Sequence, residues 1–139
     1  MKVDRFISEQ INLSPDAAQW LTFAKSDLRA ARPLLTDVEV PARIACFHAQ
    51  QAAEKAIKAV LIFEETSFRK THDVIVLAGL LPGELIDELD SIDPVVLQQW
   101  AVDGRYPGDL PDATTSEANE VLLVAAAIVA AMDSHLAKP

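Results

Sequence analysis

The sequence predicts an all-α protein that folds as an up-and-down antiparallel bundle of four to five helices. Apolar residues make up 50% of the 139 residues and only 4 residues are glycine, which is typical of a folded and mostly helical chain. Several long segments repeat apolar residues at three- and four-residue spacing, and none alternates apolar and polar residues as a half-buried strand does. A chain of this length is most simply one domain. We therefore expect a lead-in over residues 1–13 and a single helical domain over residues 14–139.

The first helix is expected to begin at Ser14-Pro15, because serine is a favoured N-cap and proline is tolerated at the first helical position. One apolar stripe follows at helical spacing: Trp20, Leu21, Ala24, Leu28, Ala31, Leu34 and Leu35. Pro33 should weaken the last turn of this helix. A turn over residues 36–41 then leads into the second helix.

The second helix is predicted over about residues 42–64. Its alanines recur at positions 45, 49, 52, 56 and 59, which would let neighbouring backbones approach closely. Bulky apolar residues lie beside this strip, so apolar or small residues extend around much of the circumference. Such a helix is expected at the centre of a bundle.

The rest of the chain predicts shorter helices and one long final helix. These segments are expected over residues 74–81, 84–90, 95–102 and 116–137. Asp73 can cap the first of them, and Pro82-Gly83 can end it. Residues 104–114 should form a long loop, since they hold two prolines and two glycines. Thr114 and Glu117 match a capping box for the final helix.

Charge is unevenly placed along the chain, whose formal net charge is −9. Residues 1–82 contain ten basic and ten acidic residues, whereas residues 83–139 contain two basic and eleven acidic residues. A protein that coats nucleic acid should carry a basic surplus, so this class is excluded. An anion site must therefore be local and must draw on the first half, while the acidic half should be a solvated surface.

The single cysteine and the apolar runs indicate a cytoplasmic protein with no membrane association. Cys46 excludes an internal disulfide framework, fits a reducing compartment, and should be buried and inert within the second helix. The N-terminus lacks the apolar core of a signal peptide. The longest apolar run, residues 121–132, is too short to cross a bilayer.

Polar residues of the second helix form the first candidate site. His48, Gln51 and Lys55 follow a spacing of three and then four, so they lie on one side of the helix. They could offer hydrogen bonds and a positive charge to an anion. The alternative is a polar seam between helices or between subunits.

The segment Lys70-Thr71-His72-Asp73 forms the second candidate site, because it leads into a predicted helix N-terminus that would suit phosphate. Histidine can change charge near neutral pH, so His72 could act as a general acid or base. The alternative is that Asp73 is only a cap and that His72 is a side-chain latch.

Two arginines complete the candidates. Arg43-x4-His48 has a spacing that could bind a phosphodiester and move a proton, although five residues turn the two side chains to different faces of a helix. Arg105, in the segment Arg105-Tyr106-Pro107, either pairs with a carboxylate or reaches over a pocket. No phosphate-cradling glycine motif and no recognised metal-ligand spacing is present, so no cofactor and no metal site is predicted.

The chain resembles the HEPN family (higher eukaryotes and prokaryotes nucleotide-binding domain) over about residues 15–137. The likeness rests on Trp20 with Lys25 to Leu28, on Phe47 to Lys58, on Lys70 to Val74 and, more weakly, on Arg105 to Pro107. The resemblance implies a bundle of four or five helices that is commonly dimeric and is often encoded with a minimal nucleotidyltransferase. Other members are metal-free endoribonucleases that use Arg-x4-6-His in the later part of the bundle. Here Arg105 has no histidine four to six positions beyond it, and Arg43-x4-His48 stands in the second helix.

Three hypotheses follow from the residues and the resemblance together. The first is a homodimeric module that binds a nucleotide or RNA phosphate and acts with a minimal nucleotidyltransferase in a toxin–antitoxin-like system. Its expected pocket combines Lys25, His48, Gln51, Lys55, Lys70 and His72, with Arg105 as a further ligand-binding residue. The second is a metal-independent endoribonuclease toxin, in which His72 or His48 transfers the proton and Arg43 or Arg105 holds the phosphate. The third is a purely structural dimerisation module.

Overall fold

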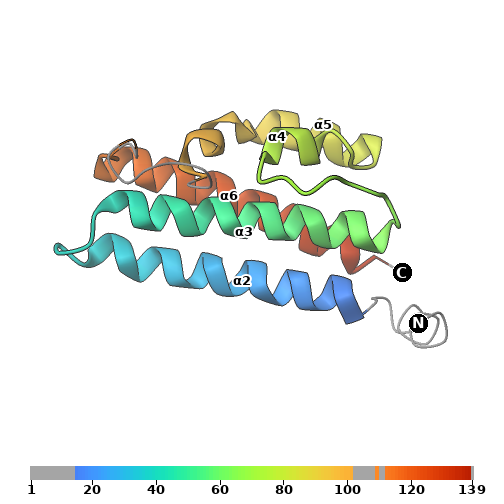
Figure 1. Ribbon diagram of the computed structural model, residues 1–139, viewed down its shortest axis with the longest axis horizontal. Helices are drawn as coiled ribbons and strands as arrows, with labels where there is room; N and C mark the ends of the chain where they lie inside the picture. The colour runs from blue at the N-terminus through green and yellow to red at the C-terminus, as the bar shows by residue number, and fades with distance from the viewer. Residues whose placement is uncertain (1–14, 102–108, 110–111, 139) are drawn as a thin grey trace.

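The computed structural model describes residues 15–101, 109 and 112–138, and this part of the chain contains helices and connecting turns but no strand (Figure 1). The helices in order are α2 (Pro15–Thr36), α3 (Ala42–Phe63), α4 (Val74–Ala78), α5 (Gly83–Ile92), the 3-10 helix η1 (Pro94–Trp100) and α6 (Thr115–Leu136). The predicted lead-in over residues 1–13 and the predicted cap Ser14 lie outside the described residues. The predicted all-α antiparallel bundle is confirmed.

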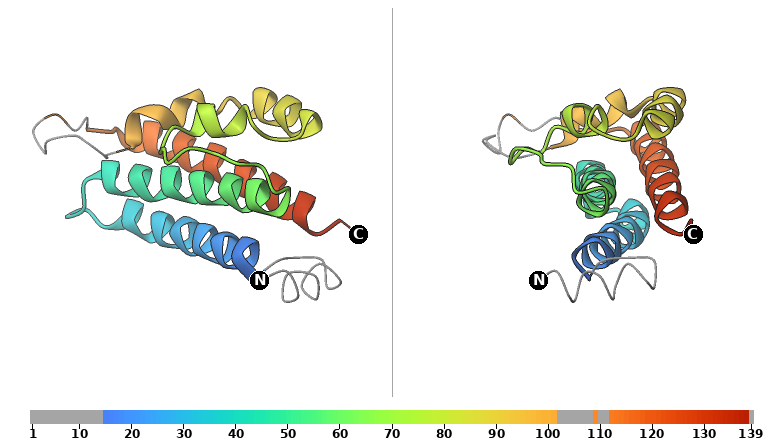
Figure 2. Two further views of the ribbon diagram at one scale, coloured as in Figure 1. Left: turned by 45° about the vertical axis from the view of Figure 1, so that its right-hand side comes forward. Right: turned by 90° about the vertical axis from the view of Figure 1, so that its right-hand side faces the viewer.

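The three long helices α2, α3 and α6 lie side by side, and the shorter elements form a layer on α3 and α6, on the side away from α2 (Figures 1 and 2). Helix α2 runs antiparallel to α3, while α6 runs parallel to α3 and contacts both. Helix α4 and η1 pack on α3, and α5 packs on α6. The chain is therefore built around α3, as the sequence predicts for a central helix.

Helix α3 can lie at the centre of the bundle because many of its own side chains are small. The five alanines that recur along it, at positions 45, 49, 52, 56 and 59, are all fully buried. Ile57, Val60 and Leu61 are also fully buried and fill the space beside that strip. Because alanine side chains are short, α2 and α6 can both approach the α3 backbone. The hydrophobic core is thus one continuous cluster along α3.

Helix ends follow the predicted caps where the structure describes them. The Thr114 hydroxyl accepts a hydrogen bond from the Glu117 N–H at 3.0 Å, and the Glu117 carboxylate accepts one from the Thr114 N–H at 2.9 Å. This is the predicted capping box, and α6 begins one residue later, at Thr115. Helix α2 continues through Pro33 to Thr36, so proline is accommodated one turn before the end.

The short elements differ from the prediction. Helix α4 ends at Ala78 rather than at residue 81, and the Gly79 N–H closes it by donating to the Ile75 carbonyl. Residues 94–100 form a 3-10 helix rather than an α-helix, because Pro94, Leu97 and Trp100 are all buried and a three-residue repeat places them on one face. Burial of these side chains in the core decides the local geometry.

Cys46 lies fully buried in α3, as predicted. Burial, together with the negative charge of Glu117, raises the pKa of its thiol to about 11. A thiol with so high a pKa remains protonated at neutral pH, so it is a poor nucleophile and packs as a small apolar side chain.

Helix α6 is longer than the apolar run over residues 121–132. Over its full 22 residues it is long and apolar enough to cross a membrane, and it is the one such helix in the described part of the chain. Its inner side, including Val121, Leu122 and Ile128, is buried against the bundle, and core helices of soluble proteins can be equally long and apolar. On its outer side the apolar residues Leu123, Ala127 and Ala130 are exposed.

Candidate functional site

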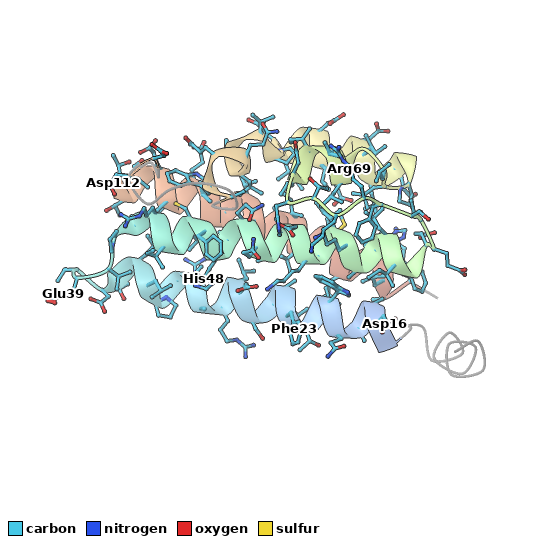
Figure 3. All side chains as sticks on the ribbon, viewed as in Figure 1. Asp16, Phe23, Glu39, His48, Arg69 and Asp112 are labelled. Atoms are coloured by element: carbon cyan, nitrogen blue, oxygen red, sulfur yellow. The ribbon has the colours of Figure 1, made fainter. Side chains whose placement is uncertain are left out.

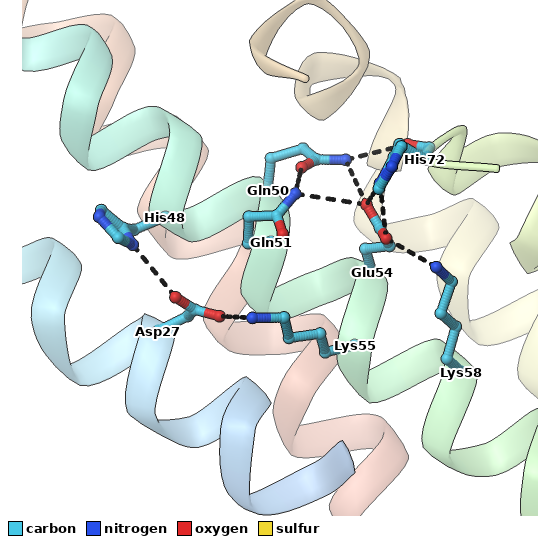
Figure 4. Close-up of polar contacts among 8 residues, drawn as sticks. All are labelled: Asp27, His48, Gln50, Gln51, Glu54, Lys55, Lys58 and His72. Carbon is cyan, nitrogen blue, oxygen red and sulfur yellow. Dashed lines mark hydrogen bonds and ion pairs between the residues drawn. The ribbon is translucent and has the colours of Figure 1, made fainter. Parts of the chain in front are cut away.

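The contact between α2 and α3 gathers the first group of polar side chains around Asp27 (Figure 4). His48 Nδ1 lies 3.1 Å from one carboxylate oxygen of Asp27, and Lys55 Nζ lies 2.6 Å from the other. His48 and Lys55 come from α3, seven residues apart, so they lie on the same side of that helix. Figure 3 shows His48 on the side of α3 that faces α2. The predicted common face of His48 and Lys55 is therefore confirmed, and it is directed at a carboxylate.

A second group gathers around the buried carboxylate of Glu54, which is only 2% exposed (Figure 4). Lys58 Nζ lies 2.8 Å from one oxygen, and His72 Nδ1 lies 3.0 Å from the same oxygen. Gln50 and Gln51 each donate an amide N–H to the other oxygen, at 3.3 and 3.4 Å. The carboxylate thus has several donors, as a buried charge requires.

Lys58 is itself buried, with 7% of its surface exposed. Its ammonium lies 5.5 Å from the centre of the Trp20 ring and 5.9 Å from that of Phe68. Both distances are within the range of a cation–π interaction. Helix α2 and the segment that follows α3 therefore close over the Glu54–Lys58 ion pair from two sides.

The segment before α4 is fixed to α3 by backbone contacts as well. Gln50 donates its side-chain N–H to the His72 carbonyl at 3.0 Å. Asp73 caps α4, because its carboxylate accepts hydrogen bonds from the N–H groups of Ile75 and Val76 at 2.9 and 3.1 Å. The predicted cap is confirmed. Since these two N–H groups are occupied, they are not available to a phosphate. An anion site in the segment from Lys70 to Asp73 would have to use other donors, and it stays a prediction.

The two carboxylates determine which ring nitrogen of each histidine carries the proton. A carboxylate can only accept, so the Nδ1 atoms of His48 and His72 must donate, and the proton of a neutral ring then resides on Nδ1. Nε2 of such a ring is an acceptor when the ring is neutral and a donor when it is protonated. The side chain of His48 is 32% exposed, and its Nε2 has no hydrogen-bond partner among the described residues. His48 can therefore present this atom to a ligand.

The structure does not bring all the predicted site residues into one pocket. His48, Gln51 and Lys55 lie on α3 as expected, and His72, in the segment before α4, contacts Glu54 of α3. Lys25 is directed to α6, where its ammonium lies 2.9 Å from Asp133, so its inclusion in the expected α3 pocket is wrong. Lys70 is exposed, two residues before His72.

The two candidate arginines lie apart from this face or outside the described residues. The Arg43 guanidinium lies 3.2 Å from Asp112, just before α6, whereas His48 is directed to α2. Arg43 and His48 therefore do not act as a pair on one phosphate. Arg105 lies outside the described residues.

Four residues of these two groups were not among the predicted site residues: Asp27, Gln50, Glu54 and Lys58. Glu54 and Lys58 have the four-residue spacing of a helical ion pair, which was a usable signal. Asp27 lies three residues after Ala24 and four before Ala31, both fully buried, and a carboxylate at that spacing requires a partner. Its two partners could not be read from sequence, because they depend on how α2 sits against α3.

Metal ligation has no support in this geometry. In the described ranges there is no group of three or more histidine, cysteine, aspartate or glutamate side chains that could hold a metal ion. Each of the two carboxylates is paired with a lysine, Asp27 with Lys55 and Glu54 with Lys58.

In the described residues, the fold and the site define a helical bundle whose central helix supplies one member of each of two carboxylate–imidazole pairs. A family model described as HEPN domain matches residues 17–135. This range is well over half of the chain, so the chain belongs to the HEPN family, and the resemblance found in the sequence is confirmed.

Two solved structures are similar to the bundle. One is the crystal structure of TT1696 from Thermus thermophilus, with a TM-score of 0.70, 30% sequence identity, and coverage of 85% of this chain and 96% of that chain. The other is ST0689, an archaeal HEPN homologue, with a TM-score of 0.66, 25% identity, and coverage of 86% and 97%. No curated protein matches the chain.

Proposed function

We propose that this HEPN domain binds a phosphate group of a nucleotide or of RNA on the polar face of α3. We further propose that it does so as a cytoplasmic homodimer acting with a minimal nucleotidyltransferase in a toxin–antitoxin-like system. The single observation that carries the binding proposal is the Asp27–His48 pair, which leaves His48 Nε2 directed away from its carboxylate with no partner among the described residues. The partner, the compartment and the assembly rest on what family membership implies.

The carboxylates of the face are already paired with lysines, so they are not free charges that would repel a phosphate. Asp27 and Glu54 are offset by Lys55 and Lys58, so the group has no net charge while both histidines are neutral. Nε2 of His48 donates to a phosphate oxygen only when the ring carries protons on both nitrogens. Lys70 adds an exposed positive charge in the segment that leads to His72.

Thermal unfolding with and without ligand tests this proposal. ATP, GTP and a ten-residue oligoribonucleotide would be added separately, because they distinguish a nucleotide site from an RNA site. A ligand present at one hundred times its Kd should stabilise the fold by about 2.7 kcal/mol. His48→Gln should abolish the shift, whereas His135→Gln should retain it, since His135 pairs with Glu64 near the end of α6. No shift with any of the three ligands would contradict the proposal.

A second candidate function is metal-independent RNA cleavage, and the same Asp27–His48 pair favours it. A histidine whose Nδ1 is held by a carboxylate presents Nε2 as a general base. This hypothesis predicts cleavage of an oligoribonucleotide in the presence of EDTA that is lost in His48→Ala or His72→Ala. Cleavage that persists in both variants would rule out these histidines as the proton-transfer groups.

The proposed partner is tested by co-expression with a minimal nucleotidyltransferase encoded beside this chain. The two proteins should co-purify at a constant ratio through size-exclusion chromatography. Light scattering of the chain alone gives its mass and decides between monomer and homodimer.

A further inference from the structure

A row of basic residues lies on the side of α2 opposite Asp27. Lys25, Arg29 and Arg32 are spaced by four and then three residues, which places them on one face of the helix. Lys25 and Arg29 each stand two residues from Asp27, and two residues turn a helix by about 200°. The row therefore belongs to a different surface from the α3 polar face.

These residues line a groove of about 580 Å³ between α2 and α6. Its floor is apolar and is formed by Leu28 and Pro33 of α2 and Ala126 of α6. Lys25 reaches across to Asp133 of α6, with 2.9 Å between ammonium and carboxylate. The groove runs along α2 to Thr36, a rise of about 16 Å or three helical turns.

The charge of this groove is not balanced by the chain itself. Among the residues that the structure describes, neither Arg29 nor Arg32 has an ion-pair partner, although the whole chain carries a net charge of −9. Like charges three or four residues apart repel one another and cost stability. An anionic partner would relieve this repulsion, so charge complementarity points to an acidic ligand.

The outer side of α6 extends the apolar floor. Leu123 is 67% exposed. Ala127 and Ala130 are also exposed, and helical spacing places them on the same side of α6 as Ala126, which is half-buried. Small side chains along a helix let a second helix approach closely, and Leu123 provides an apolar anchor. A small anion would bind the arginines but would leave this apolar strip uncovered, whereas an amphipathic helix would contact both.

We propose that the groove formed by Lys25, Leu28, Arg29, Arg32, Pro33 and Ala126 is a docking surface for an acidic amphipathic helix of a partner protein. The apolar side of that helix lies on Leu28, Ala126 and Leu123, and its carboxylates pair with Arg29 and Arg32. The site is independent of the proposed phosphate site, since the two occupy opposite sides of α2. The groove is long enough to contact about three turns of the partner helix.

Fluorescence anisotropy with a designed peptide tests this docking surface. The probe is a labelled 18-residue helix with leucine and alanine on one side and glutamate along both flanks. One control peptide has the same composition in permuted order, which removes the apolar stripe, and the other carries lysine in place of glutamate. The first peptide should bind, and its affinity should fall as salt is raised.

Variants then assign the binding to the groove. The double variant Arg29→Glu/Arg32→Glu should weaken binding at least tenfold. The control Arg69→Glu/Lys138→Glu, with the same change of charge, should change it less than twofold, since Arg69 lies on the far side of the bundle from α2 (Figure 3). Leu123→Ser should weaken binding, and His48→Gln should leave it unchanged, which separates this test from that of the phosphate site.

Four outcomes would overturn the proposal. Equal binding of the permuted peptide would mean that charge alone is recognised. Tighter, arginine-dependent binding of a single-stranded oligonucleotide, or of phosphatidylserine vesicles, would assign the groove to nucleic acid or to a membrane surface. A homodimer that is lost only in Arg29→Glu/Arg32→Glu would mean that a second copy of the chain covers the groove.

Discussion

Replacement of Glu54 by alanine should be among the most destabilising substitutions in this protein. The carboxylate is 2% exposed and accepts hydrogen bonds from Lys58, His72 and both neighbouring glutamines of α3. Without it, the buried ammonium of Lys58 has no counter-charge. Breaking a buried pair by removing one partner costs about 3–5 kcal/mol. Because folded domains are stable by only about 5–15 kcal/mol, Glu54→Ala should lose a large part of the total.

Substitutions at Lys58 separate the cost of losing the Glu54 charge from the cost of leaving Lys58 unpaired. Lys58→Met keeps an unbranched apolar chain against Trp20 and Phe68 but removes the charge, so it leaves Glu54 with His72 as a partner. Glu54→Gln/Lys58→Met removes both charges at nearly constant volume. The double variant should be about 1–3 kcal/mol more stable than the separate losses of Glu54→Gln and Lys58→Met add up to, because it leaves neither charge buried and unpaired.

Urea unfolding followed by far-ultraviolet circular dichroism measures these differences at neutral pH. Glu88→Ala is the matched control, because Glu88 is exposed on α5, and it should lie within about 0.5 kcal/mol of the wild type. If Glu54→Ala lost less than about 1 kcal/mol, or if the two single changes were additive, the ion pair would not have the buried character assigned to it.

Two further predictions concern α3 and α6. Thr114→Ala removes half of the capping box of α6 and should lower the free energy of unfolding by about 1 kcal/mol. Thr114→Ser keeps the hydroxyl and should keep the stability of the wild type. Equal stability of the two variants would mean that the cap is unimportant. Cys46 should not react with a thiol reagent at pH 8 until the protein is unfolded, because burial and Glu117 raise its pKa to about 11. Because the pKa of the thiol is higher in the folded than in the unfolded protein, the contribution of the protonated thiol to the free energy of unfolding is fully present below pH 9.0, the ordinary pKa. That contribution is lost as the pH rises toward 11. Rapid labelling of the native protein at pH 8 would contradict the buried position.

The long helices were predictable because their signals are local. Helical spacing of apolar residues, the alanine strip of α3 and the capping box at Thr114 all act within a few residues of one another. The short elements were less predictable, because η1 and the end of α4 depend on which side chains the core accepts. Pro94, Leu97 and Trp100 adopt a three-residue repeat only because a buried surface faces them.

The candidate site, like the fold, was predictable where it depends on local residue spacing and not where it depends on helix packing. The sequence alone determined that α3 carries a polar face with His48, Gln51 and Lys55, and that Asp73 caps the following helix, because these relations depend on residue spacing within one segment. The tertiary structure decided which groups they meet: Asp27 of α2 joins His48 to Lys55, and Glu54 receives His72 from the segment that leads into α4. It also directed Lys25 to α6 and Arg43 to Asp112, away from that face. Spacing fixes the face of a helix on which a residue lies, but the packing of one helix against another fixes its partner.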